Sequence, residues 1–285
     1  MLSKLERVGI ILRPSSPILK EFFLKVRALF ENEGIDVMLD SISGGMIGVY
    51  GSDFQRLCAE SDMLVSIGGD GTLISVARRS YGYGKPILGI NMGRLGFLTD
   101  VQQDEVAEFI KGLKSGEYRM ESRLMLEGEL LLKNGAQKFH ALNEIILTRR
   151  PTSGMIRIQA SINGAPFNTY FGDGLIIATP TGSTAYNISA GGPVVYPYSQ
   201  NLILTPICAH SLTQRPLILP GEFKIELELE DGGYASLVID GQEVLEFSHH
   251  ECLKISTAPI PAVLIQHKEH DYFDVLRKKF NWGNG

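Results

Sequence analysis

Cysteine is scarce in this sequence, which has three cysteines among 285 residues and no CxxC spacing. A disulfide framework would need more cysteines, and a cysteine-based zinc site would need closer spacing. We therefore expect Cys58, Cys208 and Cys252 to be buried apolar fillers.

Long apolar runs and basic runs are also missing. No segment approaches the roughly 18 uninterrupted apolar residues of a membrane span, and the first apolar run is too short for a signal peptide. These absences predict a cytoplasmic protein without a membrane partner. Lys and Arg total 27 against 32 Asp and Glu, a net charge of −5, which argues against nucleic acid as a partner. Glycine-rich turns can still bind the phosphates of a small molecule.

The first part of the chain alternates strand and helix signals. Short apolar runs at 8–12, 35–39, 63–67 and 87–90 are bounded by Gly or Pro and predict buried strands. Apolar residues at three- and four-residue spacing predict one helix from Leu19 to about Gly34 and another around 106–113. The fold class predicted for this part is an α/β N-terminal domain with a mostly parallel sheet.

From about residue 118 the apolar period changes to two. Alternating stretches are interrupted by Asn134-Gly135, Asn163-Gly164 and Gly232-Gly233, which predicts three β-hairpins and a β-rich, antiparallel C-terminal domain. We expect an α/β domain at 1–120, a β-rich domain at 121–265, and a segment at 266–285 that packs back on the N-terminal domain.

The motif at 68–72, Gly-Gly-Asp-Gly-Thr, follows a predicted strand and leads into a helical pattern. Glycines there let a ligand approach the backbone, and the helix N-terminus favours phosphate. The carboxylate of Asp70 would repel phosphate, so it suggests a metal-bridged phosphate or a base. The alternative is an ordinary turn in which Asp70 caps the helix. A dinucleotide fingerprint and a Walker loop are both absent.

A second polar stretch runs from Phe171 to Tyr186 and is followed by Gly191-Gly192-Pro193. Its hydroxyl side chains and terminal aromatic suit hydrogen bonds to sugar or phosphate groups and stacking on a base, although a plain Ser/Thr-rich turn has the same composition. Asn143-Glu144 precedes an apolar run and alone could cap a strand end.

Taken together, these motifs resemble those of the bacterial NAD kinases, which phosphorylate the adenosine-ribose 2′-hydroxyl of NAD to give NADP. GGDGT by itself is shared with lipid and sugar kinases, but the ordered set is far more specific. It comprises GGDGT at 68–72, NMGRLGFLTD at 91–100, LNEI at 142–145, DGLIIATPTGSTAY at 173–186, AGGP at 190–193, HSLTQRPLILP at 210–220 and IDGQ at 239–242.

The resemblance implies a role for each matching residue. Asp70 would act on the accepting 2′-hydroxyl. The turn around the nucleotide phosphates would include Gly68, Gly69, Gly71 and Thr72. The ribose and adenine would be held by Asn143 and Glu144, inside a wall formed by Thr181, Thr184, Ala185 and Tyr186. The remaining matches are Phe97 beside the dinucleotide, Asp173 toward the nicotinamide end, and Asp240. Asp240 matches an acidic residue of the site that in family members reaches across a subunit interface.

The resemblance also implies ATP and NAD as substrates, with polyphosphate open as a donor, and a divalent metal cation, Mg or Mn, not held by a dedicated protein cage. It implies a homo-oligomer, dimer or tetramer, which would also cover the apolar strands expected at 124–132 and 167–171. Two alternatives remain: another GGDGT kinase with a lipid or sugar substrate, and a non-catalytic NAD(P)-binding regulator. The preference between NAD and NADH, the metal used, and feedback by NADP or NADPH stay open.

Overall fold

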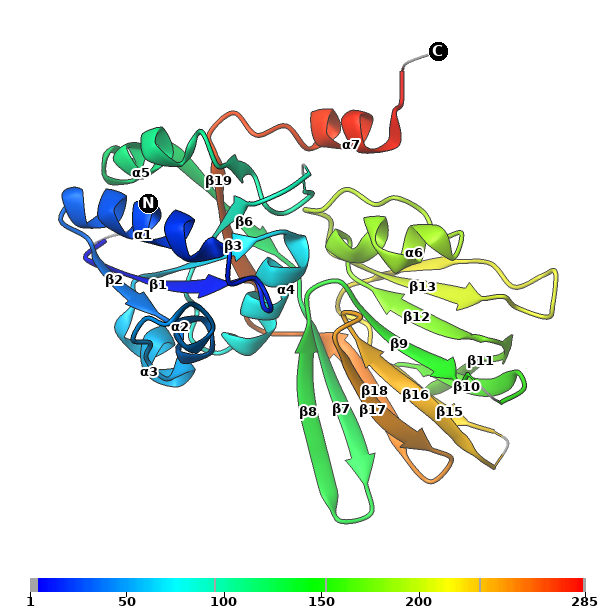
Figure 1. The fold of residues 1–285 in the computed structure, drawn as a ribbon. Coiled ribbons are helices and arrows are strands. Elements are labelled where there is room, and N and C mark those ends of the chain that lie inside the picture. The colour runs from blue at the N-terminus through cyan, green and yellow to red at the C-terminus, as the bar shows by residue number, and fades with distance from the viewer. Residues whose placement is uncertain (1–4, 95, 152, 231, 284–285) are drawn as a thin grey trace. The chain divides into compact units, whose positions relative to one another are not determined.

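The computed structural model describes residues 5–94, 96–151, 153–230 and 232–283 (Figure 1). The chain forms two compact units, one made of Met1–Ser122 with Ala262–Gly285 and the other of Arg123–Pro261. The chain therefore returns to the first unit at Ala262, shortly before the position 266 at which the sequence suggested a C-terminal segment.

The first unit is built on a seven-stranded sheet in the order β2-β1-β3-β4-β19-β6, with β5 beside β4. The pairs of β1 with β2 and β3, and of β4 with β3, β5 and β19, are all parallel. The strands are β1 (Arg7–Leu12), β2 (Asp36–Leu39), β3 (Met63–Gly68), β4 (Ile87–Asn91), β5 (Val101–Gln102), β6 (Tyr118–Arg123) and β19 (Ala262–His267). The last of these, β19, completes the sheet from a distant part of the sequence.

The first unit also contains helices, the last of which lies away from the strands of the sheet (Figure 1). They are α1 (Leu19–Asn32), α2 (Ser41–Ile47), α3 (Phe54–Glu60), α4 (Asp70–Arg79), α5 (Val106–Ser115) and α7 (Tyr272–Phe280). The predicted end of α1 is confirmed, because Gly34 follows it with a left-handed φ of +68°. The short helices α2 and α3 carry too few apolar residues to show a helical period. Each begins after an aspartate, Asp40 or Asp53, whose carboxylate accepts hydrogen bonds from backbone N–H groups of the first turn.

The second unit consists of two six-stranded sheets in which all neighbouring strands pair antiparallel. One has the order β11-β10-β15-β18-β7-β8 and the other β14-β13-β12-β9-β16-β17. Side chains from both sheets share one hydrophobic core, as in a β-sandwich. The strands are β7 (Leu126–Leu132), β8 (Gly135–Ala141), β9 (Glu144–Arg149), β10 (Ile156–Ile162), β11 (Ala165–Gly172), β12 (Gly174–Ala178), β13 (Asn201–Ile207), β14 (Leu217–Pro220), β15 (Ile225–Leu229), β16 (Tyr234–Ile239), β17 (Glu243–Ser248) and β18 (Cys252–Thr257). A 3-10 turn η1 (Thr181–Thr184) and a helix α6 (Tyr186–Ser189) follow β12.

Two of the three predicted hairpins are confirmed. The Asn-Gly turns join β7 to β8 and β10 to β11. The third prediction is wrong, because β15 pairs with β10 and β18, whereas β16 lies in the other sheet beside β9 and β17. The residues around Gly232-Gly233 therefore connect the two sheets. Alternating apolar residues show that one face of a strand is buried. Strands of either sheet of a sandwich bury one face in the shared core, so alternation alone does not tell which sheet a strand joins.

Other predictions can be compared with this architecture. The fold class, an α/β domain with a mostly parallel sheet and an antiparallel β-rich domain, is confirmed. Cys58 is buried, but Cys208 is exposed with a left-handed φ and Cys252 is half-buried, so these two are not core fillers. Strand β7 is not an edge, since β18 and β8 flank it, whereas β11 is an edge strand. None of the described helices is both long and apolar enough to span a membrane.

Candidate functional site

The glycine-rich turn lies between β3 and α4, and close packing explains its composition. A Cβ on Gly68 would lie 2.3 Å from Thr72 Oγ1, so a side chain there would collide with the first turn of α4. A Cβ on Gly69 would meet no atom within 4 Å among those described, which leaves its backbone open to a ligand. Gly69 is the N-cap of α4 and its carbonyl accepts from Thr72 N at 3.0 Å.

Asp70 is the first residue of α4 rather than its cap, so the capping interpretation is wrong. Its carboxylate accepts four hydrogen bonds from the following loop. Oδ2 accepts from Phe97 N at 2.7 Å, and Oδ1 accepts from Leu98 N at 3.2 Å, Thr99 N at 3.0 Å and Thr99 Oγ1 at 2.9 Å. The loop thus holds Asp70 in one orientation at a helix N-terminus, where negative charge is favoured.

The loop can approach Asp70 because residue 96 is glycine. A Cβ on Gly96 would lie 2.1 Å from Asp70 Oδ1 and 2.4 Å from Thr99 Oγ1. The next residue, Phe97, is half-buried and packs on the C-terminal helix, with ring centroids 6.5 Å from Tyr272 and 5.9 Å from Phe280. The second glycine of the GRLGF motif, Gly96, therefore lets the loop pack directly against the carboxylate of Asp70.

In the second unit, Asp240 fixes the backbone at the start of β9. Its carboxylate accepts from Leu142 N at 2.9 Å, Asn143 N at 2.8 Å and Glu144 N at 3.0 Å. Asp240 is 7% exposed, so its carboxylate is engaged inside its own chain. A role for Asp240 in the site of an adjacent subunit stays a prediction.

The Thr/Ser-rich stretch lies against Asn143. Thr179 N donates to Asn143 O at 2.8 Å, and a Cβ on Gly182 would lie only 2.1 Å from that same oxygen. Three buried polar atoms of this cluster, Asn143 Oδ1, Glu144 Oε2 and Thr181 Oγ1, have no hydrogen-bond partner among the described residues. Buried polar groups are normally paired, so these three atoms suit a polar ligand.

Burial changes the titration of Glu144. Desolvation of its carboxyl, which is 4% exposed, and the nearby negative charge of Asp240 raise the pKa of Glu144 to about 8. At neutral pH the group therefore keeps its proton and can both donate and accept a hydrogen bond.

Asp173 lies apart from this cluster. It precedes β12, whereas Thr181 follows it, so the two are separated by the length of a five-residue strand, roughly 17 Å. The carboxylate of Asp173 accepts from Arg149 Nε at 2.7 Å. Arg149, the last residue of β9, was not anticipated from the sequence.

The remaining wall residues lie on η1 and α6. Thr184 is half-buried, Ala185 joins the two elements, and Tyr186 is 45% exposed at the start of α6. Asn187 explains the adjacent AGGP motif, because its buried amide donates to Pro193 O at 3.0 Å and would lie 2.1 Å from a Cβ on Gly192.

The structure thus groups most of the sequence candidates into one set in each unit and leaves Asp173 outside both. The set in the first unit comprises Gly68, Gly69, Asp70, Thr72 and Phe97, together with Gly71, which is exposed in the first turn of α4. Gly96 and Thr99 were not predicted as site residues, although both lie in the NMGRLGFLTD motif at 91–100. A buried or half-buried carboxylate needs hydrogen-bond donors, and this requirement is the one signal in the sequence that could have indicated the glycine-containing motif at 91–100.

The comparisons with known proteins cover both units. Residues 8–118 match the ATP-NAD kinase N-terminal domain and residues 142–267 match the ATP-NAD kinase C-terminal domain. The chain is 72% identical over 283 residues to an NAD kinase of Wolinella succinogenes, covering 99% of this chain and 98% of that protein. It is 39% identical over 282 residues to an NAD kinase of Campylobacter jejuni, covering 98% and 97%.

Solved structures of an NADH kinase and an NAD kinase also resemble this chain over nearly its whole length. A yeast NADH kinase in complex with NADH superposes with a TM-score of 0.90 at 25% identity, covering 99% of this chain and 89% of that one. An NAD kinase from Archaeoglobus fulgidus in complex with ATP superposes with a TM-score of 0.76 at 28% identity, covering 96% and 98%.

Proposed function

This chain belongs to the ATP-NAD kinase family, and we propose that it transfers the γ-phosphate of ATP to the adenosine-ribose 2′-hydroxyl of NAD. The protein is a phosphotransferase enzyme. Among the alternatives left open by the sequence, the matched families favour this activity over a lipid or sugar kinase and over a non-catalytic regulator.

The observation that carries the proposal is the cluster of buried polar atoms without partners in the second unit. Asn143 Oδ1 and Thr181 Oγ1 can accept hydrogen bonds from ribose or adenine groups, and the protonated carboxyl of Glu144 can donate one. Asp240 holds the backbone that carries Asn143 and Glu144, so we assign it a positioning role.

For the transfer step we assign the base role to Asp70. A ribose hydroxyl is a poor nucleophile, and a positioned proton acceptor typically contributes ~100- to 10,000-fold. Oδ1 of Asp70 already accepts three hydrogen bonds, whereas Oδ2 accepts one from the described donors. Oδ2 is therefore the oxygen assigned to the proton of the hydroxyl, and the donors on Oδ1 keep the carboxylate aligned.

A divalent cation is expected for phosphoryl transfer. The described residues contain no group of three or more His, Cys, Asp or Glu side chains that could hold a metal ion. We propose that Mg²⁺ or Mn²⁺ binds with the phosphates of ATP, and we assign no step to it.

A coupled assay tests the proposed activity. The protein is incubated with ATP, magnesium and NAD, and the NADP formed is measured with an NADP-specific dehydrogenase. Parallel reactions replace ATP by polyphosphate and NAD by NADH, which addresses the donor and acceptor choices. Absence of NADP formation by the folded protein with every donor would refute the proposed function.

Two substitutions test recognition of the dinucleotide. Asn143→Ala removes a buried acceptor, and Tyr186→Ala removes a half-exposed ring. We expect each to weaken NAD binding by ~1–3 kcal/mol, through lost hydrogen bonding and lost stacking respectively. Calorimetric titration of NAD gives the affinity, and Tyr50→Ala, at an exposed tyrosine of the other unit, serves as control. Unchanged affinity in both variants would place the dinucleotide elsewhere.

We also propose that the chain forms a homo-oligomer, a dimer or tetramer. Edge strand β11 supports this, because Phe167 on it is 48% exposed and its outer backbone groups have no neighbouring strand in the described sheet. Phe167→Lys should then lower the mass measured by light scattering. A wild-type chain that stays a monomer of about 31 kDa at assay concentrations would contradict the proposal.

A further inference from the structure

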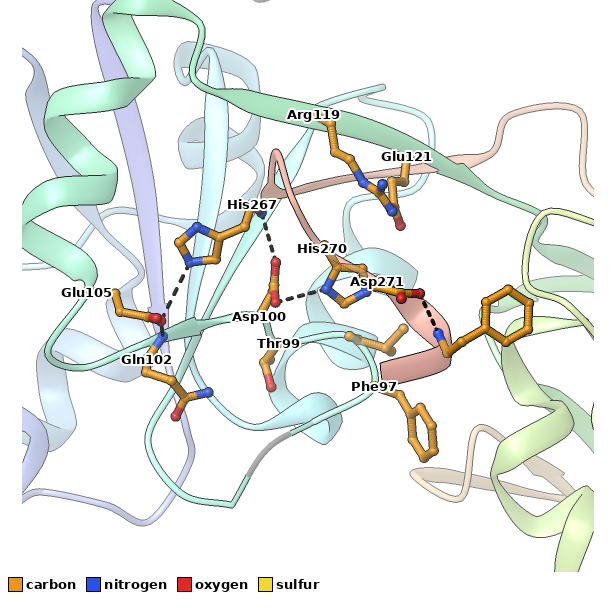
Figure 2. A network of polar contacts seen from close by, with 12 residues as sticks. Phe97, Thr99, Asp100, Gln102, Glu105, Arg119, Glu121, His267, His270 and Asp271 are labelled. Atoms are coloured by element: carbon orange, nitrogen blue, oxygen red, sulfur yellow. Dashed lines mark hydrogen bonds and ion pairs between the residues drawn. The ribbon is translucent and has the colours of Figure 1, made fainter. Parts of the chain in front are cut away.

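Asp100 joins two distant parts of the first unit. Its Oδ2 accepts from His267 N at 2.8 Å and its Oδ1 pairs with His270 Nδ1 at 2.9 Å. Figure 2 shows Asp100 between the two histidines, with Glu105 on the far side of His267. The side chain of His270 is only 3% exposed and that of Asp100 12%, so the pair is shielded from water.

The pair lies next to the donors that hold Asp70. Thr99, the residue before Asp100, gives two of the four hydrogen bonds to the Asp70 carboxylate. The chain after His270 enters α7, whose Tyr272 and Phe280 pack on Phe97, which gives a third. Residues 97–100 are therefore bound on one side by Asp70 and on the other by the C-terminal segment.

The electrostatics favour an ionised Asp100. Burial alone would raise the pKa of Asp100, but the hydrogen bonds and charges of His270 and His267 outweigh burial, and the pKa lies below its ordinary value. A groove of about 870 Å³ borders the pair. Its charged groups near α5 are Glu105, Glu108 and Glu117. Those of the C-terminal segment are Lys268, Glu269, Asp271, Asp274 and Lys278.

From this arrangement we propose that Asp100 and His270 are positioning residues for phosphoryl transfer. Their pair ties the C-terminal segment to residues 97–100 and so fixes the donors that orient the carboxylate of Asp70. The proposal rests on the proposed function and on the base role assigned to Asp70. Neither Asp100 nor His270 touches substrate in this assignment, and both act through Thr99 and Phe97.

Breaking the pair should reduce turnover more than binding. In His270→Ala, residues 97–99 lose their external support, and we expect kcat to fall about tenfold while KM for NAD and ATP changes less than about twofold. Hydrogen exchange of the amides at 97–99 should speed up by a similar factor, independently of any activity. The matched control is Asp274→Ala, which removes an exposed carboxylate of the same segment and should change neither quantity.

A conservative variant gives a readout that a purely structural role would not move. In Asp100→Asn the side-chain oxygen must keep facing His267 N–H, so its amide NH₂ faces His270 Nδ1. An unprotonated Nδ1 accepts that hydrogen bond, so Asp100→Asn can keep both contacts of the side chain. We expect Asp100→Asn to keep kcat within about threefold of the wild type, whereas Asp100→Ala, which loses both contacts, should lower kcat about tenfold, as His270→Ala does.

The outcomes distinguish the positioning role of Asp100 and His270 from the proposed kinase activity. Normal kcat and normal exchange in His270→Ala, in an active wild-type enzyme, would overturn the positioning role and leave the proposed function intact. Should His270→Ala fail to fold, equal kcat values in Asp100→Asn and Asp100→Ala would overturn it equally. An inactive wild-type enzyme whose His270→Ala variant still shows faster exchange would refute the proposed function instead.

Discussion

Asp70→Asn should lower kcat by about a hundredfold or more while NAD affinity stays within a few-fold. The substitution removes the proton acceptor but keeps the size of the side chain. The structure adds a second consequence, because both carboxylate oxygens accept hydrogen bonds. Whichever oxygen becomes an amide NH₂, it will face N–H or O–H donors, so the 97–99 segment will also be strained. The coupled assay gives kcat, and calorimetry gives the affinity for NAD.

A second variant separates the base from the anchor. Thr99→Val removes one of the four donors and leaves the carboxylate of Asp70 in place. If Asp70 is the base, Thr99→Val should reduce kcat less than about tenfold. Similar losses in both variants would show that Asp70 acts only by holding the loop, and near-normal turnover in Asp70→Asn would refute the base assignment.

The stability of the substrate-free protein should depend on Glu144 over a wide pH range. Its folded-state pKa is raised to about 8, so the folded form keeps a proton that the unfolded form releases near pH 4. The contribution of Glu144 is thus fully present below about pH 4 and is lost as the pH rises to about 8. Between about pH 5 and pH 8 we expect a loss of roughly 4 kcal/mol in the free energy of unfolding.

The isosteric variant Glu144→Gln isolates this effect, because the amide cannot ionise. Urea unfolding at several pH values should show the wild type losing stability relative to Glu144→Gln as the pH rises. A parallel pH dependence in the two proteins would mean that Glu144 is ionised at neutral pH in the folded state. A matched exposed control is Glu246→Gln, which should follow the wild type.

The sequence predicted the elements whose pattern is local. The apolar runs of the parallel sheet, the period of α1 and the Asn-Gly turns of β7–β8 and β10–β11 are set by neighbouring residues, and the structure confirms them. The family was predicted from motifs, and the matched domains confirm it. The roles assigned to individual site residues stay predictions. The structure does show why residues 96 and 182 are glycines, because they pack directly against Asp70 and Asn143.

What the sequence missed depends on contacts between distant segments. The sheet partner of β4 from residues 262–267, the exchange of sheets between β15 and β16, and the pairing of Asp100 with His270 leave no periodic signal. The same holds for Asp240, whose acidic side chain resembles a ligand-binding group by type. Its carboxylate accepts from three backbone amides about 100 residues earlier in the chain, a separation over which local propensity carries no information.

The buried amide of Asn187 has a consequence for the thermodynamics of recognition. It joins α6 to Ser183 O, Pro193 O and the hydroxyl of Thr205, and so restrains the segment around Tyr186 without any ligand. Ordering a flexible loop typically costs about 0.5–1.5 kcal/mol for each side chain immobilised. Because this loop is already ordered, the entropic cost of association should be small, and the dinucleotide should meet a surface whose shape changes little on binding.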